Sequence, residues 1–233
     1  MNNGQLAAVI LAAGSSSRMG GAKKEYQRLK TGATVLENAV CAFAALSSIK
    51  IIVIAVPENE EAITRESLPS ELFEGIGELK ILFVTGGRTR RASVFNALLL
   101  LKSINPEYVL IHDGARPWVS CSLIENIVVA VKKHGAVIPL VPLSDTPKEL
   151  ESGEDTEQSG IFIKKHLKRA NIGVAQTPQA FRFPEILYAH EKAADVNEEF
   201  TDDAEIWDRF CGQVAVIPGD PQNRKITFPE DLF

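Results

Sequence analysis

The chain has 233 residues, of which 45% are hydrophobic and 24% charged, the composition of an ordinary globular protein with one sizeable core. Its formal net charge of −5 argues against nucleic acid as the main partner, because nucleic-acid-binding proteins usually carry a basic excess. A negative total does not exclude small anionic ligands, since local basic clusters can bind them.

The cysteines and the apolar runs indicate the compartment. Cys41, Cys121 and Cys211 form no CxxC pair, so the sequence indicates neither a zinc site nor a redox motif, and we expect reduced, mostly buried thiols. No positive charge precedes the first apolar stretch, and no apolar run approaches the ~20 residues that cross a bilayer. We therefore expect a cytoplasmic protein with no membrane partner.

Short apolar runs alternate with amphipathic stretches through the first half, which is typical of βαβ units. The runs predict strands at 6–11, 51–56, 81–84, 108–112 and 136–141. A capping-box pattern at Thr34 and Glu37 predicts a helix through Leu46, and a second helix is expected over 123–133 after Ser120. The fold class predicted is α/β, with a Rossmann-like, mostly parallel sheet flanked by helices.

The pattern fails over 142–170, where two prolines and an acidic, polar run are followed by several basic residues. A structureless loop of this length is unusual in a compact domain, so we predict a projecting β-arm that packs on a partner. A mobile surface loop is the alternative. After it, the sequence predicts an apolar return at 172–175, helices at 184–194 and 202–210, and a strand at 214–217. We expect one domain over 1–233 that contains the arm.

The first predicted strand runs directly into a loop rich in glycine and serine. Small side chains let backbone N–H groups approach phosphate oxygens, and ligands of open α/β sheets bind at the carboxyl ends of strands. Gly14, Gly20 and Gly21 fit neither the GxGxxG spacing of dinucleotide sites nor the P-loop. The loop therefore predicts a nucleotide phosphate site of another kind.

A concentration of cations follows these glycines, against the single acid Glu25. A triphosphate needs such charge, whereas a solvated basic surface without a ligand is the alternative. The cations are Arg18, Lys23, Lys24, Arg28 and Lys30.

A second segment, Gly86-Gly87 followed by Arg88-Thr-Arg-Arg and Ser93, also follows a strand and opens a helix. Because it repeats the design of the first loop, we expect both to face one crevice. A glycine turn followed by a charged first helical turn is the alternative.

The third element is a buried strand that ends in His112-Asp113, close to Arg116. Near a triphosphate, Asp113 would position Mg²⁺ or a polyol hydroxyl, because Mg²⁺ takes few carboxylates and keeps phosphate and water ligands. A plain Asp113 to Arg116 salt bridge is the alternative. We interpret His112 as a structural neighbour and not as a catalyst.

Taken in order, these segments resemble the 2-C-methyl-D-erythritol 4-phosphate cytidylyltransferases of the non-mevalonate isoprenoid pathway. The resemblance runs over nearly the whole chain. It rests on Ala12-Ala13-Gly14, Arg18-Met19, Lys24 with Tyr26, Gly86-Gly87, Ser93-Val94, His112-Asp113, Ala115-Arg116-Pro117, Asp145-Thr146 with Lys148, Thr177-Pro178-Gln179, Thr201-Asp202, and Lys225 with Pro229-Glu230-Asp231-Leu232.

The resemblance implies a cytidylyltransferase of the nucleotide-diphospho-sugar transferase fold type, which uses CTP, a polyol phosphate and Mg²⁺. It assigns catalysis to Arg18, Lys24, Arg169 and Lys225. It assigns substrate binding to Ala13, Gly14, Gly87, Ser93, Asp113, Arg116, Thr146 and Thr201, with Asp113 also in the metal region. It further implies a homodimer in which Thr146 and Arg169 reach into the neighbouring subunit's site.

The residue types agree with that chemistry, because an attacking phosphate oxygen is already an anion and needs no general base. The chain departs from the family pattern at Glu25, where the family usually has glutamine, and at Arg88, where an acidic residue is common. The alternatives are a ribitol-5-phosphate cytidylyltransferase and a non-catalytic nucleotide-binding regulator. A nucleotide-sugar glycosyltransferase is disfavoured, because the sequence contains no Asp-x-Asp pair.

Overall fold

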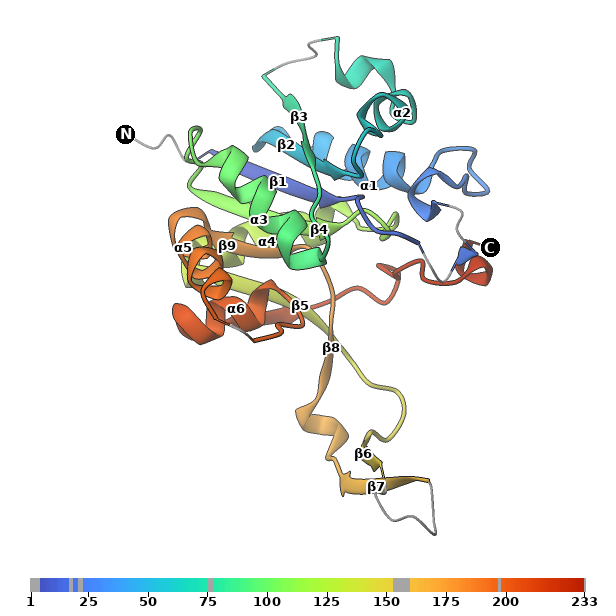
Figure 1. The fold of residues 1–233 in the computed structure, drawn as a ribbon, viewed down its shortest axis with the longest axis vertical. Coiled ribbons are helices and arrows are strands. Elements are labelled where there is room, and N and C mark those ends of the chain that lie inside the picture. Colours follow the sequence, from blue (N-terminus) through green and yellow to red (C-terminus); the bar gives the residue numbers. More distant parts are fainter. Residues whose placement is uncertain are drawn as a thin grey trace.

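The computed structural model describes residues 5–16, 19–20, 23–74, 78–152, 160–196 and 198–232. One mixed sheet forms the centre of the molecule, helices cover both of its faces, and a two-stranded hairpin projects from it (Figure 1). The strands of the main sheet are β1 (Leu6–Leu11), β2 (Ile49–Val56), β3 (Lys80–Thr85), β4 (Tyr108–Asp113), β5 (Ala136–Pro142), β8 (Gly173–Ala175), β9 (Gln179–Arg182) and β10 (Ala215–Pro218). The predicted α/β fold is confirmed.

The strand order is β10-β5-β9-β4-β1-β2-β3, and β8 pairs with β5. Strands β4, β1, β2 and β3 are mutually parallel, and so are β5 and β10, whereas β9 is antiparallel to both of its neighbours. The chain winds from β1 outwards to β3 and then returns to β4 on the other side of β1. This reversal makes the carboxyl ends of β1 and β4 the topological switch point, where open α/β sheets bind ligands.

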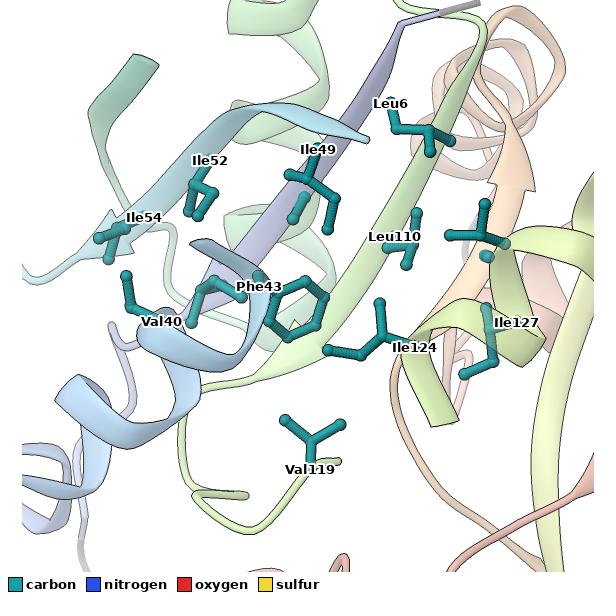
Figure 2. Packing of buried hydrophobic residues seen from close by; sticks show 14 of the residues in the cluster. Leu6, Val40, Phe43, Ile49, Ile52, Ile54, Leu110, Val119, Ile124 and Ile127 are labelled. Atoms are coloured by element: carbon teal, nitrogen blue, oxygen red, sulfur yellow. The ribbon is translucent and has the colours of Figure 1, made fainter. Parts of the chain in front are cut away.

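Two apolar layers pack the faces of the sheet. On one face, α1 (Val35–Ala44) and α4 (Cys121–His134) bury Phe43, Ile124 and Ile127 against Leu110 (Figure 2). On the other face, α3 (Arg90–Leu101), α5 (Phe183–Ala194) and α6 (Asp203–Phe210) pack on the remaining strand side chains. This double cover explains why the predicted strands are apolar at nearly every position.

Local signals placed several helix ends correctly. Thr34 and Glu37 form a complete capping box at the start of α1, as predicted. Ser120 caps α4 and Asp202 caps α6, each through its side-chain oxygen. A short helix α2 (Glu61–Glu66) and the 3₁₀ turns η2 (Lys24–Tyr26), η3 (Ser70–Leu72), η4 (Arg169–Asn171) and η5 (Pro229–Leu232) complete the fold.

The segment predicted as an arm contains β6 (Lys148–Ser152) and β7 (Ile161–His166), which pair antiparallel as a separate sheet. The hairpin lies well away from the main sheet (Figure 1). Its side chains are largely exposed, and the exposed apolar ones include Leu150, Ile161, Phe162 and Ile163. Residues 153–159 of the predicted acidic run lie outside the described residues.

The expectation of mostly buried cysteines was wrong. Cys121 and Cys211 are exposed and Cys41 is half-buried, and all three are free thiols. Cys121 and Cys211 lie at helix ends, at the start of α4 and just after α6, where side chains emerge from the layers. In the described part of the chain, no helix is long and apolar enough to cross a membrane.

Candidate active site

A cavity of about 370 Å³ opens at the switch point, beyond the carboxyl ends of β1 and β4. Three segments supply its walls, and they are the three that the sequence singled out: the loop after β1, the loop between β3 and α3, and the end of β4. Lys225, from the segment after β10, completes it. The lining residues are Leu11, Ala13, Gly14, Ser15, Lys24, Glu25, Gly87, Arg88, Thr89, Arg90, Ser93, Asp113, Ala115 and Lys225.

The two glycine loops pack against each other. A Cβ atom on Gly86 would lie 2.2 Å from the Cβ of Ala13, and one on Gly87 would lie 2.3 Å from the Cβ of Ala92. Neither position can therefore carry a side chain without displacing backbone. Ser93 locks the second loop, because its Oγ accepts the Gly87 N–H at 3.0 Å. The prediction that both loops face one crevice is confirmed.

The first loop is fixed by a buried carboxyl group. Glu25 is 2% exposed and accepts a hydrogen bond from the Ser16 hydroxyl at 3.2 Å, while Ser16 Oγ accepts the Lys24 N–H at 3.2 Å. Burial raises the pKa of Glu25 and outweighs hydrogen bonding to its own backbone N–H and the attraction of Lys24 and Lys23. Lys23 itself donates to the Gly14 carbonyl at 3.0 Å.

Asp113, at the end of β4, is surrounded by cations. Its Oδ2 lies 2.8 Å from Lys225 Nζ and 3.7 Å from Arg116 Nε, and its Oδ1 lies 3.4 Å from Arg90 Nε. Burial alone would raise the pKa of Asp113, but Lys225 and Arg90 hold it well below its ordinary value. The Asp113 to Arg116 salt bridge, the alternative to a site, exists as one contact among three.

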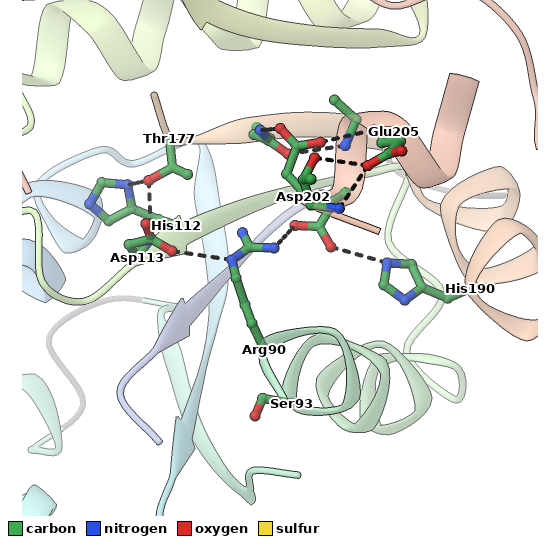
Figure 3. A network of polar contacts seen from close by, with 12 residues as sticks. Arg90, Ser93, His112, Asp113, Thr177, His190, Asp202 and Glu205 are labelled. Atoms are coloured by element: carbon green, nitrogen blue, oxygen red, sulfur yellow. Dashed lines mark hydrogen bonds and ion pairs between the residues drawn. The ribbon is translucent and has the colours of Figure 1, made fainter. Parts of the chain in front are cut away.

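Arg90 connects this carboxylate to a second one behind the cavity (Figure 3). Its Nη1 donates to Asp203 Oδ2 at 2.8 Å, and Asp203 Oδ1 lies 3.1 Å from His190 Nε2. Burial alone would lower the pKa of Arg90, but Asp203 and Asp113 raise it above its ordinary value. Arg90 is therefore a fixed cation with a carboxylate on each side.

His112 is a structural residue, as interpreted from the sequence. Its Nε2 lies 3.2 Å from the Arg116 carbonyl, which can only accept, so Nε2 carries the hydrogen. Its Nδ1 then accepts from the Thr177 hydroxyl at 3.0 Å, and the same hydroxyl accepts the Asp113 N–H at 3.1 Å. Complete burial lowers the pKa of His112 to about 4, so the ring is neutral and orients Asp113 through Thr177.

The structure gathers most, but not all, of the residues predicted for the site. The cavity brings together Ala13, Gly14, Lys24, Gly87, Ser93, Asp113 and Lys225. Arg116 adjoins it through Asp113, and Arg18 lies outside the described residues.

Three further predicted residues lie elsewhere in the described part of the chain. Thr146 and Arg169 belong to the arm, where Arg169 Nη1 donates to the Ser144 carbonyl. Thr201 precedes α6, and both its N–H and its hydroxyl donate to Glu205. None of the three lines the cavity of this single chain.

Sequence reasoning missed Arg90 and Asp203. Arg90 stands in a run of basic residues, where no spacing distinguishes it from Arg88 or Arg91. Asp203 follows another aspartate at a predicted helix start, where acidic residues are common because they suit the helix dipole. The signal was therefore indistinguishable from ordinary helix capping.

The donor set limits how a metal ion could bind. Among the described residues, no group of three or more His, Cys, Asp or Glu side chains lies close enough to form a protein cage for an ion. Mg²⁺ commonly binds through one or two carboxylates together with substrate phosphates and water. Asp113 fits that mode through Oδ1, whose one ion-pair contact within the described residues is the long one with Arg90.

The whole sequence is similar to one family of known enzymes. The family model described as IspD, 2-C-methyl-D-erythritol 4-phosphate cytidylyltransferase, matches residues 6–233. The chain is 35% identical over 225 residues to the 2-C-methyl-D-erythritol 4-phosphate cytidylyltransferase of Bacillus mycoides, covering 97% of this chain and 93% of that protein. It is 36% identical over 230 residues to the bifunctional enzyme IspD/IspF of Bartonella tribocorum, and it spans 54% of the length of that relative.

Solved structures of the same family match the fold of this chain. The 4-diphosphocytidyl-2C-methyl-D-erythritol synthase of Anaerococcus prevotii matches with a TM-score of 0.81 and 30% identity, covering 97% of this chain and 92% of that chain. The IspD of Francisella tularensis matches with a TM-score of 0.75 and 29% identity, covering 98% and 96%. The chain therefore belongs to the 2-C-methyl-D-erythritol 4-phosphate cytidylyltransferase family and is a cytidylyltransferase.

Proposed function

We propose that this chain joins CTP and 2-C-methyl-D-erythritol 4-phosphate in the cavity at the switch point, giving 4-diphosphocytidyl-2-C-methyl-D-erythritol and pyrophosphate. One observation carries the proposal: two lysines from distant segments, Lys24 and Lys225, line the same cavity as two glycine loops. Glycine loops suit a nucleotide, and the lysines suit the phosphates of two anionic substrates.

The reaction needs positioning and charge neutralisation more than acid or base groups. An oxygen of the acceptor phosphate attacks the α-phosphorus and forms the new P–O bond. The bond from that phosphorus to the oxygen bridging to the β-phosphate breaks, and pyrophosphate leaves with the electron pair. Lys24, together with Arg18, would contact the triphosphate and stabilise the negative charge of the transition state and leaving group.

The glycine loops would hold the nucleoside. Ala13 and Gly14 follow β1, and Gly87 and Ser93 flank the start of α3, so the loop residues and the N-terminal turn of a 12-residue helix line the cavity. The N-terminal end of a helix favours bound anions. A tight approach of backbone to ligand is possible at Ala13, Gly14 and Gly87, because these positions carry a methyl group or no side chain. Arg88, which also lines this wall, would lie beside the base.

Asp113 would face the acceptor polyol and the metal region, with Arg116 beside it. Through Oδ1 it could hold one Mg²⁺, whose remaining ligands would be triphosphate oxygens and water. Bound Mg²⁺ supplies charge that offsets the repulsion between the two anionic substrates. Lys225, paired with Asp113 at 2.8 Å, would position the sugar phosphate.

The arm would complete the site of a second subunit. Thr146, Arg169 and the apolar residues of β6 and β7 are exposed in the single chain. Burying the apolar side chains against a partner would stabilise a homodimer at about 25 cal/mol per Å² of apolar surface. In that dimer, Arg169 would meet the acceptor phosphate bound by the partner, while Thr201 would close the cavity from the α6 side.

Ribitol 5-phosphate is the alternative acceptor, since it presents the same phosphate chemistry and differs only in the polyol. The test is product formation from CTP and Mg²⁺ with each acceptor at equal concentration, followed by mass analysis of the product. We expect the methylerythritol conjugate to form with the higher kcat/KM. Faster turnover of ribitol 5-phosphate would reassign the acceptor, and no product with either would overturn the proposal.

A further inference from the structure

Arg90 is shared between two carboxylates that play different parts. Its Nε faces Asp113 Oδ1 at 3.4 Å, and its Nη1 faces Asp203 Oδ2 at 2.8 Å. The closer contact is with Asp203, which does not line the cavity. The guanidinium is therefore held mainly from behind, and it reaches Asp113 only with a long contact.

Both carboxylate oxygens of Asp203 are engaged by buried or half-buried partners. Its side chain is fully buried, its Oδ1 pairs with the His190 imidazole at 3.1 Å, and its Oδ2 pairs with Arg90. An isolated buried carboxylate is costly, so it persists only with such partners. Burial would raise the pKa of Asp203, but Arg90 and His190 lower it, so the group stays ionised.

The position of Arg90 determines which cation contacts each carboxylate oxygen of Asp113. Lys225 and Arg116 approach Oδ2, which leaves Oδ1 to Arg90 alone among the ion pairs of the described residues. Without the pull of Asp203, the guanidinium would move onto Asp113 and form a close pair. Such a pair would occupy Oδ1 and draw the carboxylate away from Lys225.

We propose that Asp203 is a positioning residue, which restrains Arg90 so that Asp113 Oδ1 stays available to the metal-bound substrates while Oδ2 orients Lys225. His190 supports Asp203 from the far side. This inference rests on the proposed role of Asp113. It assigns a part in the reaction to two buried residues, Asp203 and His190, that touch no substrate.

The test compares Asp203→Asn, Asp203→Glu and the neighbouring Asp202→Asn in steady-state assays and in calorimetric titrations of Mg²⁺ into the CTP-bound proteins. We expect Asp203→Asn to raise the half-saturating Mg²⁺ concentration and the KM for the acceptor by roughly 10–100-fold, as supporting residues of metal sites do. The KM for CTP and the folded fraction should change less. Asp203→Glu, which keeps the charge, should recover most of the loss.

Asp202→Asn is the matched control, because Asp202 caps the same helix but bonds Gln179 and the Glu205 N–H, not Arg90. It should change the melting temperature and leave the Mg²⁺ dependence unaltered. If Asp203→Asn does not fold, Arg90→Lys tests the link from the other side, since a single ammonium cannot bridge both carboxylates. It should raise the same two constants.

Asp113→Asn distinguishes the role proposed for Asp113 from the positioning role proposed for Asp203. Normal Mg²⁺ and acceptor dependence in Asp113→Asn would overturn the role proposed for Asp113 itself. A defect in Asp113→Asn, combined with unchanged constants in folded Asp203→Asn, would overturn only the positioning role of Asp203.

Discussion

Lys225 Nζ lies 2.8 Å from Asp113 Oδ2 and ties the C-terminal segment to the end of β4. The contact joins two walls of the cavity whose strands, β10 and β4, are not direct neighbours in the sheet. Because Asp113 is buried and ionised, it fixes the ammonium group at a defined place instead of leaving a mobile lysine at the rim. A buried carboxylate thus fixes the place of a cation in the wall of the cavity.

Lys24→Ala should lower kcat/KM by about 10²–10³-fold, which is the usual cost of removing one group that stabilises transition-state charge. The physical reason is that Lys24 lines the cavity at the loop proposed to hold the triphosphate. The control is Lys30→Ala, since Lys30 is an exposed lysine beyond the same 3₁₀ turn. Steady-state pyrophosphate release measures both, and near-normal turnover by Lys24→Ala would remove the role.

Arg169→Ala should raise the KM for the acceptor phosphate by roughly 10–100-fold and change the CTP dependence little, because one charge-assisted contact to that phosphate is lost. Lys165→Ala, which removes another exposed cation of the arm, should leave both constants unchanged. A change confined to the CTP dependence would contradict the assignment.

Mixing Lys24→Ala and Arg169→Ala subunits, at an acceptor concentration well below the raised KM so that each variant alone is nearly silent, tests whether the arm acts across a dimer. If Arg169 serves the partner's site, one of the two sites in each mixed dimer is intact. Random pairing should then restore about a quarter of wild-type activity. Recovery at the level of the separate variants would place Arg169 in its own subunit's site.

Glu25→Gln should stabilise the protein at neutral and alkaline pH. Because burial raises the pKa of Glu25, the folded protein binds this proton more tightly than the unfolded chain does. Stability from this group is present below its ordinary value of 4.5 and is lost as the pH rises through the folded value. Thermal melts at pH 5 and pH 8 should show a larger gain from Glu25→Gln at pH 8, about 2 °C or more.

The exposed Glu74 supplies the control for that series, because Glu74→Gln removes the same charge from the surface. We expect it to change the melting temperature equally little at both pH values. A Glu25→Gln protein that is less stable at pH 8 would show that the charged carboxylate holds the loop.

His112 should make the stability of the protein fall between neutral and acid pH. The folded protein keeps the ring neutral down to about pH 4, whereas the unfolded chain protonates it near 6.5. The unfolded state therefore binds more protons in this window, and the free energy of unfolding should decrease by up to about 3 kcal/mol as the pH falls through it.

Denaturant unfolding of wild type and His112→Asn at pH 7, 5.5 and 4.5 measures that slope. His112→Asn should be less stable at pH 7 but lose less on acidification. His134→Asn, which removes an exposed histidine at the end of α4, should keep the wild-type slope. Equal slopes for wild type and His112→Asn would rule out the neutral, buried ring.

The sequence anticipated the parts of this fold that depend on local patterns. The run 6–11 coincides with β1, because a strand covered on both faces is apolar throughout. The capping box at Thr34 could be predicted because its pattern lies within four consecutive residues. Strand β9 was missed because Gln179–Arg182 is short and mixed in polarity, although it lies between β4 and β5. Its position depends on tertiary pairing, which no local window contains.

In the candidate site, too, the features set by local sequence could be predicted and those set by tertiary contacts could not. Glycine loops and the aspartate at the end of β4 could be predicted, because they follow strands and the carboxyl ends of parallel strands meet. The pairing of Arg90 with Asp203 could not, since the two residues are separated by 113 positions and neither carries a distinctive spacing. Arrangements that depend on which helices share a face of the sheet require the structure.

The most direct test of the central claim follows the label of radioactive CTP in the presence of Mg²⁺ and 2-C-methyl-D-erythritol 4-phosphate. With α-³²P-labelled CTP the organic product should carry the label, and with γ-³²P-labelled CTP the label should appear only in pyrophosphate. Lys24→Ala and Lys225→Ala should lose both signals together. Transfer of the γ-label to the acceptor, or full transfer of the α-label by both lysine variants, would contradict cytidylyl transfer in this cavity.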